Sequence, residues 1–149
     1  MKVFFLGGRP GAAERARVTL QTRHPNLNVG TYCPPYGFES DSEEVALINF
    51  KIQAAAPHLL FVGLGAPKQE KWMYSHYKTL GVPVSVGIGV SFELVSNMVK
   101  RAPVLMQKMG LEWLFRLLVE PQRLWQRYLI GNMLFLALVF KQRLKPFKI

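Results

Sequence analysis

The stretch LLFVGLGAPKQEKW, residues 59–72, joins a short apolar run to a glycine turn and then to a polar segment that opens with proline. Its first four residues have the length and uniform hydrophobicity of a strand buried on both faces. Pro67 suits the first turn of a helix, because the N–H that proline lacks would have no partner there. The stretch therefore predicts a strand, a tight turn and a helix in direct succession.

The same order recurs over the first hundred residues. Apolar runs that read as strands lie at residues 3–6, 27–29, 59–62 and 84–88. Stretches with helical spacing lie between them, at residues 12–23, 42–56 and 68–80. Because alternating strands and helices are typical of a parallel sheet with right-handed crossovers, we expect an α/β fold with a Rossmann-like sheet.

Composition excludes several classes of protein. Half of the 149 residues are apolar and 19% are charged, so the chain can bury enough surface to fold, unlike a disordered protein. A single cysteine, Cys33, excludes a disulfide scaffold. Cys33 and the three histidines lack the short spacings of zinc ligands, and we expect neither a metal nor a cofactor.

Positive charge gathers at the carboxyl end. Residues 1–97 hold 9 Lys and Arg against 7 Asp and Glu, whereas residues 98–149 hold 10 against 2. We therefore divide the chain into a body, residues 1–102, and a basic appendage, residues 103–149. A basic segment of this kind attracts anionic partners, which include phospholipid headgroups, nucleic acid and phosphorylated substrates. Nucleic acid is the weakest of these readings, because a long apolar run separates the cations and no stacking aromatics are interleaved with them.

The appendage reads as helices that start at Pro103 and Pro121. Four apolar residues recur every four positions in the first helix and predict one continuous stripe: Leu105, Met109, Trp113 and Leu117. The apolar run at residues 128–140 would extend about 20 Å as a helix, short of the ~30 Å hydrocarbon core. With basic residues on both sides, it is expected to lie in the interface of an anionic membrane, or else to pack on the body.

Three of the four predicted strands run into glycine-rich turns, at residues 7–11, 63–67 and 87–91. Open parallel sheets bind ligands at the carboxyl ends of their strands, and glycine lets the backbone approach a phosphate closely. A nucleotide diphosphate is the natural candidate. None of the turns completes the G-x-G-x-x-G pattern, so plain tight turns remain an alternative.

Three side chains beside these turns are candidate ligand contacts. Gln69 falls in a first helical turn, where its amide can reach a ligand or simply meet solvent. Glu93 can accept hydrogen bonds from a ribose or serve as a first-turn carboxylate. Tyr36 belongs to a rigid loop, residues 34–39, that could stack on a base or pack on the body.

Taken together, the motifs resemble the WecG/TagA/CpsF glycosyltransferases over essentially the whole chain. They lie at residues 63–72, 87–89, 92–93, 100–103, 110–117, 120–124 and 127–129. The resemblance implies inverting transfer of a hexose derivative from a UDP-sugar to a polyprenyl-diphosphate-linked acceptor. It places this reaction at the cytoplasmic face of the bacterial membrane, in teichoic acid, exopolysaccharide or related polysaccharide synthesis, with the protein bound peripherally.

The resemblance also assigns residues. Gln69 falls on the motif glutamine near the reacting sugar and diphosphate, which makes it the candidate catalytic residue. Glu93 falls on an acidic position that faces the nucleoside, and Tyr36 falls in the loop expected beside the uracil. With the glycines of two turns, the expected substrate-binding set is Tyr36, Gly65, Gln69, Gly89 and Glu93. The appendage residues implied to bind the membrane and close over the diphosphate are Arg116, Arg123 and Arg127.

Two departures from the family pattern matter. Glu93 stands where aspartate is usual. Family members are usually longer at the amino end, and that part carries the proposed catalytic base, which we do not find among Glu39, Glu70 and Glu93. We therefore expect a partial chain that lacks full activity alone. The alternative is a UDP-sugar-binding fragment or partner subunit without catalysis, and an exposed sheet edge could make the chain a homo-oligomer.

Overall fold

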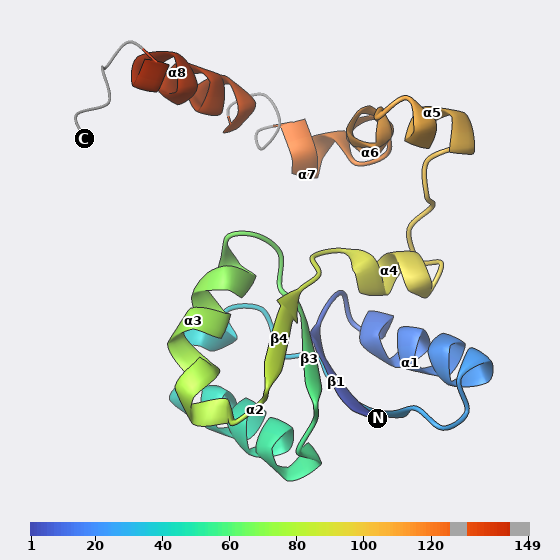
Figure 1. Ribbon diagram of the computed structural model, residues 1–149, viewed down its shortest axis with the longest axis vertical. Coiled ribbons are helices and arrows are strands. Elements are labelled where there is room, and N and C mark those ends of the chain that lie inside the picture. Colours follow the sequence, from blue (N-terminus) through green and yellow to red (C-terminus); the bar gives the residue numbers. More distant parts are fainter. Residues whose placement is uncertain (126–130, 144–149) are drawn as a thin grey trace. The chain divides into compact units, whose positions relative to one another are not determined.

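The computed structural model describes residues 1–125 and 131–143, and the chain forms two units, Met1–Lys100 and Arg101–Ile149. In the first unit, helices flank both faces of a four-stranded parallel sheet (Figure 1). Its strands are β1 (Lys2–Gly7), β2 (Asn28–Tyr32), β3 (Leu59–Gly63) and β4 (Val84–Gly87). Its helices are α1 (Ala12–Arg23), η1 (Phe38–Ser40), α2 (Ser42–Ala55), α3 (Lys68–Leu80) and α4 (Ser91–Val95).

The expected α/β fold is confirmed, and β2 is the strand that extends furthest past its predicted end. The run at residues 27–29 suggested that β2 stops at Val29, because Gly30 looked like a terminator. Instead Gly30, Thr31 and Tyr32 continue to pair with β1. A Cβ atom at Gly30 would lie 2.6 Å from the Phe4 ring, so this glycine makes room for a core aromatic and does not end the strand.

The strands run in the order β2-β1-β3-β4. The chain leaves β1 first toward β2 and then returns to its other side at β3, so the order reverses between β1 and β3. In doubly wound sheets this reversal opens the crevice in which ligands bind. The turns after β1 and β3 lie at that point.

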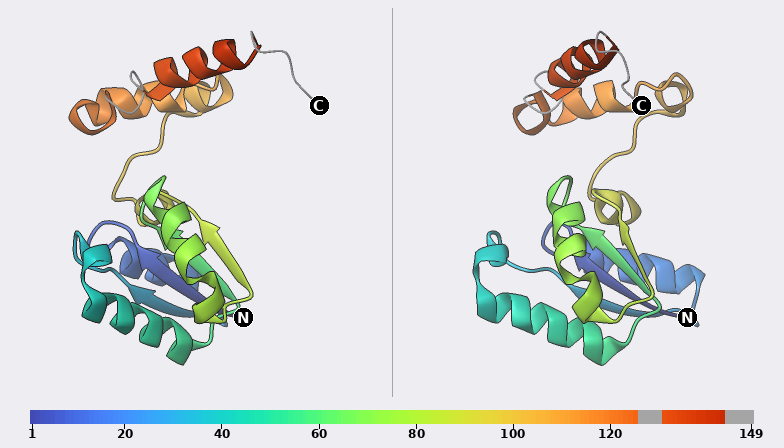
Figure 2. Two further views of the ribbon diagram at one scale, coloured as in Figure 1. Left: turned by 90° about the vertical axis from the view of Figure 1, so that its left-hand side faces the viewer. Right: turned by 60° about the vertical axis from the view of Figure 1, so that its left-hand side comes forward.

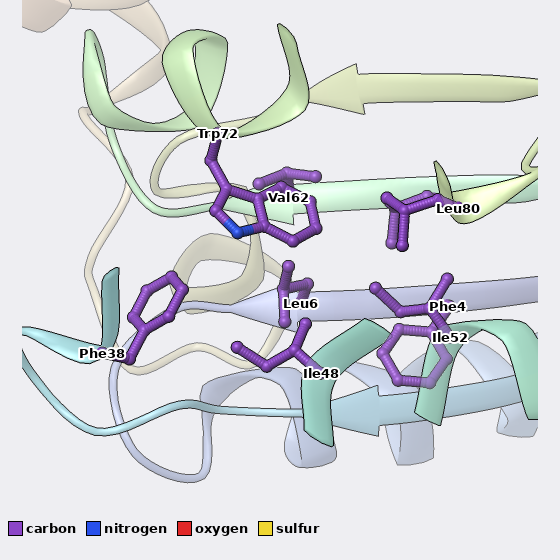
Figure 3. Close-up of a cluster of buried hydrophobic side chains, with 9 residues drawn as sticks. Phe4, Leu6, Phe38, Ile48, Ile52, Val62, Trp72 and Leu80 are labelled. Atoms are coloured by element: carbon purple, nitrogen blue, oxygen red, sulfur yellow. The ribbon is translucent and has the colours of Figure 1, made fainter. Parts of the chain in front are cut away.

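Side chains of β1 alternate between two apolar cores. Phe4 and Leu6 point toward α2 and α3, where Ile48, Ile52 and Trp72 pack on them (Figure 3). Val3 and Phe5 point to the opposite face, into the core with the alanines of α1 and Phe92 of α4. Burial on both faces explains why β1 is apolar at consecutive positions.

The helix caps follow the local sequence. Asp41 precedes α2, and its Oδ1 accepts hydrogen bonds from the N–H groups of Glu43 and Glu44 at 3.0 and 3.2 Å. This side chain satisfies two of the amides that a helix start leaves without a partner. Gly11 and Pro67 precede α1 and α3, and no side chain caps either helix.

The second unit contains α5 (Val104–Lys108), α6 (Glu112–Val119), α7 (Pro121–Trp125) and α8 (Gly131–Arg143). The predicted continuous stripe from Leu105 to Leu117 is wrong. Gly110 adopts a φ of 71°, in the left-handed region, and the chain breaks there between α5 and α6. A glycine reaches this conformation without strain, which makes it a helix terminator.

The apolar run predicted at residues 128–140 overlaps α8, although its first three residues lie outside the described part of the chain. Over the residues that are described, no helix has both the length and the apolar character needed to cross a bilayer.

The packing of β1 yields a stability prediction. Leu6 is fully buried between the sheet and α2, so Leu6→Ala should lower the free energy of unfolding by about 2–5 kcal/mol. Val18→Ala on the exposed face of α1 should change it by less than about 0.5 kcal/mol. Urea unfolding followed by circular dichroism measures both, and equal midpoints for the two variants would contradict the assigned core.

Candidate functional site

The turns after β1 and β3 are joined by a backbone hydrogen bond. The Gly8 N–H donates to the Gly63 carbonyl over 2.9 Å. Gly7 and Gly8 have φ values of 92° and 82°, which side chains rarely tolerate. The bond fixes one turn against the other at the point where the strand order reverses.

The Phe92 ring packs beneath these turns. A Cβ atom at Gly63 would lie 2.9 Å from Phe92 Cδ2 and 3.1 Å from the Gly89 carbonyl oxygen. One at Gly8 would lie 3.2 Å from the same ring. The aromatic ring and the three strand ends are therefore packed so closely that glycine is required at Gly63.

Two helices of more than ten residues begin at this edge, α1 after the β1 turn and α3 after the β3 turn. Neither has a side-chain cap at its start. The first N–H groups of a helix and its positive dipole end favour a bound anion. Gly65, with a φ of 77°, lies in the turn before α3, and a Cβ atom added there would meet nothing within 4 Å. The edge can thus present backbone donors to a negatively charged group.

Gln69 connects the β3 and β4 turns. Its side chain is 6% exposed, and Oε1 accepts a hydrogen bond from the Gly89 N–H at 3.0 Å. Its Nε2 donates to Oε1 of Glu70 at 2.8 Å. Both ends of the amide are engaged within the protein, so Gln69 positions the Gly89 turn, a role that its place in a first helical turn did not reveal.

Glu93 lies on α4 and is 4% exposed. Its Oε1 accepts a hydrogen bond from the Arg9 N–H at 3.0 Å, across to the β1 turn. Its Oε2 is buried, and no group in the described part of the chain hydrogen-bonds to it. A buried carboxylate oxygen without a donor is costly, and it marks a place where a further donor would be stabilised.

Cys33 joins this cluster, although the sequence pointed to no role for it. Its Sγ lies 3.4 Å from the Gly8 carbonyl oxygen. Burial raises the pKa of the Cys33 thiol, and the negative charge of Glu93 raises it further. Both effects favour the protonated thiol, which packs against the same turn that Glu93 holds.

Tyr36 is fully exposed on the loop before η1. Lys68 lies over its ring, with Nζ 5.2 Å from the ring centroid, and also pairs with Oε1 of Glu39 at 2.7 Å. Burial raises the pKa of Glu39, but hydrogen bonds from Lys68 and the backbone outweigh it and leave the pKa below its ordinary value. Lys68 thus ties the Tyr36 loop to the first turn of α3, next to Gln69.

All five predicted residues of the body lie near the carboxyl ends of the strands, but they differ in how far they are buried. Gln69 and Glu93 are buried beneath the turns, Gly65 and Gly89 lie in the turns, and Tyr36 stands outside them. The sequence pointed to no part for Cys33 in the site. Lys68 and Phe92 fall within the family motifs and Glu39 was considered only as a base, so the contacts that these three residues make were not predicted.

The appendage arginines are only partly described. Arg116 lies on α6 and is half-buried. Arg123 belongs to α7, but its side chain and the whole of Arg127 fall outside the described residues. Over residues 1–125 and 131–143, no three His, Cys, Asp or Glu side chains lie close enough to hold a metal ion.

Fold and site define an α/β protein of the Rossmann-like class whose glycine turns meet at the strand-order reversal. Comparison with known sequences identifies the family within this class. Residues 1–149 match the Glycosyl transferase WecG/TagA/CpsF family, and the chain belongs to that family. The resemblance seen in the motifs is thereby confirmed.

Curated relatives include N-acetylglucosaminyldiphosphoundecaprenol N-acetyl-beta-D-mannosaminyltransferases of Staphylococcus aureus, from strains MRSA252, NCTC 8325 / PS 47 and MW2. Each is 31% identical over 147 residues, which is 99% of this chain and 56% of the relative. The chain therefore spans little more than half the length of these relatives.

The electrostatic effect of Glu93 on Cys33 can be tested by alkylation. Glu93→Gln removes the charge that opposes the thiolate, so the pKa of Cys33 should fall and yet stay above its ordinary value because of burial. The pH dependence of the iodoacetamide reaction rate reports this midpoint. Glu43→Gln, at the exposed start of α2, should leave it unchanged, and equal midpoints for both variants would contradict the site geometry.

Proposed function

We propose that this chain is the nucleotide-sugar-binding part of a glycosyltransferase. The donor is a UDP-sugar that carries a hexose derivative, and the acceptor is a sugar on a polyprenyl diphosphate. The observation that carries the proposal is the Gly8–Gly63 hydrogen bond, which holds two glycine turns and two uncapped helix starts at one edge. The names of the staphylococcal relatives support the lipid-diphosphate acceptor and the hexosamine class of donor.

The geometry suits departure of a nucleoside diphosphate. When an acceptor hydroxyl attacks the anomeric carbon, the bond from that carbon to the diphosphate oxygen breaks and negative charge grows on UDP. Fixed backbone donors aimed at developing charge stabilise such a transition state. Gly65 and Gly89 would let the backbone approach the diphosphate, and Gln69 would hold the Gly89 turn in place.

Tyr36 supports recognition of the base. One face of its ring meets the Lys68 ammonium, and the ring is otherwise exposed. An exposed aromatic on a loop tied to α3 is suited to stack on uracil. Glu93 is buried whereas Tyr36 is exposed. Its Oε2, which receives no hydrogen bond from the described part of the chain, would accept one from the nucleoside.

The proton of the attacking hydroxyl must go to a base, whose contribution is typically about 10²- to 10⁴-fold in rate. Glu39 pairs with Lys68, Glu70 accepts from Gln69, and Glu93 is buried against Arg9. We infer that the base comes from the portion of the relatives outside the matched region. The chain alone would then bind UDP and turn over slowly or not at all.

The second unit supports a site beside lipid. Its described helices expose many large apolar side chains, and the basic residues of the sequence concentrate in this region. Cations near an anionic bilayer surface contribute about 1 kcal/mol each. We propose that the unit binds the membrane interface, where a polyprenyl-linked acceptor resides, and that Arg116, Arg123 and Arg127 take part.

UDP titration tests the nucleotide site. Tyr36→Ala should weaken UDP binding about tenfold in calorimetry, because stacking on a base contributes about 1–3 kcal/mol. Tyr74→Ala, which removes an exposed tyrosine from α3, is the matched control and should have no effect. Equal affinity of the Tyr36 variant and the parent chain would remove the proposed base-stacking role.

A radiolabelled transfer assay distinguishes a catalytic role for this chain from that of a subunit that only binds the UDP-sugar. With a UDP-hexosamine donor and a lipid-diphosphate acceptor, transfer should be slow or absent with this chain alone. It should rise at least a hundredfold when the portion of the staphylococcal relatives outside the matched region is supplied. UDP binding without transfer, even then, would favour the non-catalytic partner subunit.

Vesicle sedimentation tests the membrane surface. The full chain should bind vesicles that contain anionic phospholipid, and binding should weaken as salt rises because the cations are screened. A shorter chain that ends at Ala102 should lose most of this binding. Equal binding by the two chains would assign lipid contact to the body instead.

A further inference from the structure

The loop that carries Tyr36 is held to the body by the residues that follow the tyrosine. Phe38 of η1 is buried and packs in the same core cluster as Trp72 of α3 (Figure 3). Helices α2 and α3 lie side by side on this face of the sheet, and η1 directly precedes α2 (Figure 2). Tyr36 itself is fully exposed, so burial does not fix its ring. The orientation of the ring therefore depends on contacts made at the surface.

Lys68 makes such a contact. It is the first residue of α3, one helical turn before Trp72. Its Nζ lies 5.2 Å from the centroid of the Tyr36 ring and 2.7 Å from Oε1 of Glu39. An ammonium over an aromatic face is attracted to that face, and the ion pair limits where the ammonium can go. One side chain of α3 thus contacts the loop on both sides of Phe38.

The ion pair matters more for position than for stability. The side chains of Lys68 and Glu39 are 42% and 31% exposed, and partly exposed ion pairs contribute little to folding. A free lysine side chain would sample many rotamers, whereas one paired with a carboxylate samples fewer. Lys68 is therefore kept on one face of the Tyr36 ring, and the opposite face stays available for a stacked base.

We propose that Lys68 and Glu39 are positioning residues for nucleotide recognition. Glu39 holds the Lys68 ammonium, and Lys68 orients the Tyr36 ring so that its opposite face stacks on the base. This role rests on the proposed function, because it belongs to the same nucleotide site. It differs from a direct contact between Lys68 and the diphosphate, which the place of Lys68 at a helix start would otherwise suggest.

Calorimetric titration of the full chain with UDP tests the role. Lys68→Met keeps the apolar stem and removes the charge, so UDP binding should weaken about three- to tenfold. Glu39→Gln breaks the ion pair and should weaken it about two- to fivefold. Lys68→Arg should preserve the affinity, because a guanidinium pairs with a carboxylate and stacks on an aromatic ring. Lys71→Met, at an exposed lysine of the same helix, is the matched control and should have no effect.

A double variant distinguishes positioning from direct contact. If Lys68 acts through Tyr36, Lys68→Met should change UDP affinity by less than about twofold once residue 36 is already alanine. A lysine that contacts the diphosphate would instead weaken binding by the same factor with or without the tyrosine. Losses that multiply in the double variant would therefore overturn the positioning role.

Limited proteolysis measures the contact without any ligand. Chymotrypsin cleaves after exposed aromatic residues, and a loop released from α3 should be cut faster after Tyr36. Lys68→Met and Glu39→Gln should raise the initial rate of this cut at least about threefold, whereas Lys71→Met should not. Mass spectrometry of the released fragment identifies the cut, and equal rates for all variants would overturn the contact.

Failure of the positioning role is distinguishable from failure of the proposed function. If the parent chain binds UDP and Tyr36→Ala weakens binding, unchanged affinity of Lys68→Met would overturn the positioning role alone. If the parent chain does not bind UDP, the nucleotide site fails, and the positioning role fails with it.

Discussion

The hydrogen bond from the Gly8 amide to the Gly63 carbonyl holds the edge on which the rest of the site depends. Its net contribution to stability is only about 0.5–1.5 kcal/mol. Its importance is geometric, because it joins the turns on either side of the strand-order reversal. Phe92 fills the space beneath both turns, and the glycines above it are held close to one another.

Hydrogen bonds from buried polar side chains then hold the turns at this edge in position. Gln69 ties the β3 turn to Gly89, and Glu93 ties α4 to the Arg9 amide. Burying an amide and a carboxylate is costly unless their atoms find partners, and one oxygen of Glu93 finds none within the described residues. The arrangement costs some stability but holds the turns in a fixed shape, as the proposed role in stabilising diphosphate charge would require.

Three carboxylates beside the turns are engaged by partners within the body. Glu39 pairs with Lys68, Glu70 accepts a hydrogen bond from Gln69, and Glu93 accepts one from the Arg9 amide. These contacts help to fix the positions of the turns and of the Tyr36 loop.

The sequence alone determined the alternation of strands and helices, the starts of α1, α2 and α3, and the three glycine turns at one edge, because these depend on local periodicity and turn chemistry. It misjudged Gly30, which accommodates the Phe4 ring, and Gly110, which divides a predicted helix, since a glycine's role depends on what lies opposite it. Only the tertiary structure decided that Gln69 faces Gly89, that Glu93 meets Arg9, that Cys33 meets Gly8, and that Lys68 holds Tyr36. These are contacts between residues far apart in the chain, and their partners are set by how strands and helices pack rather than by any spacing along the sequence.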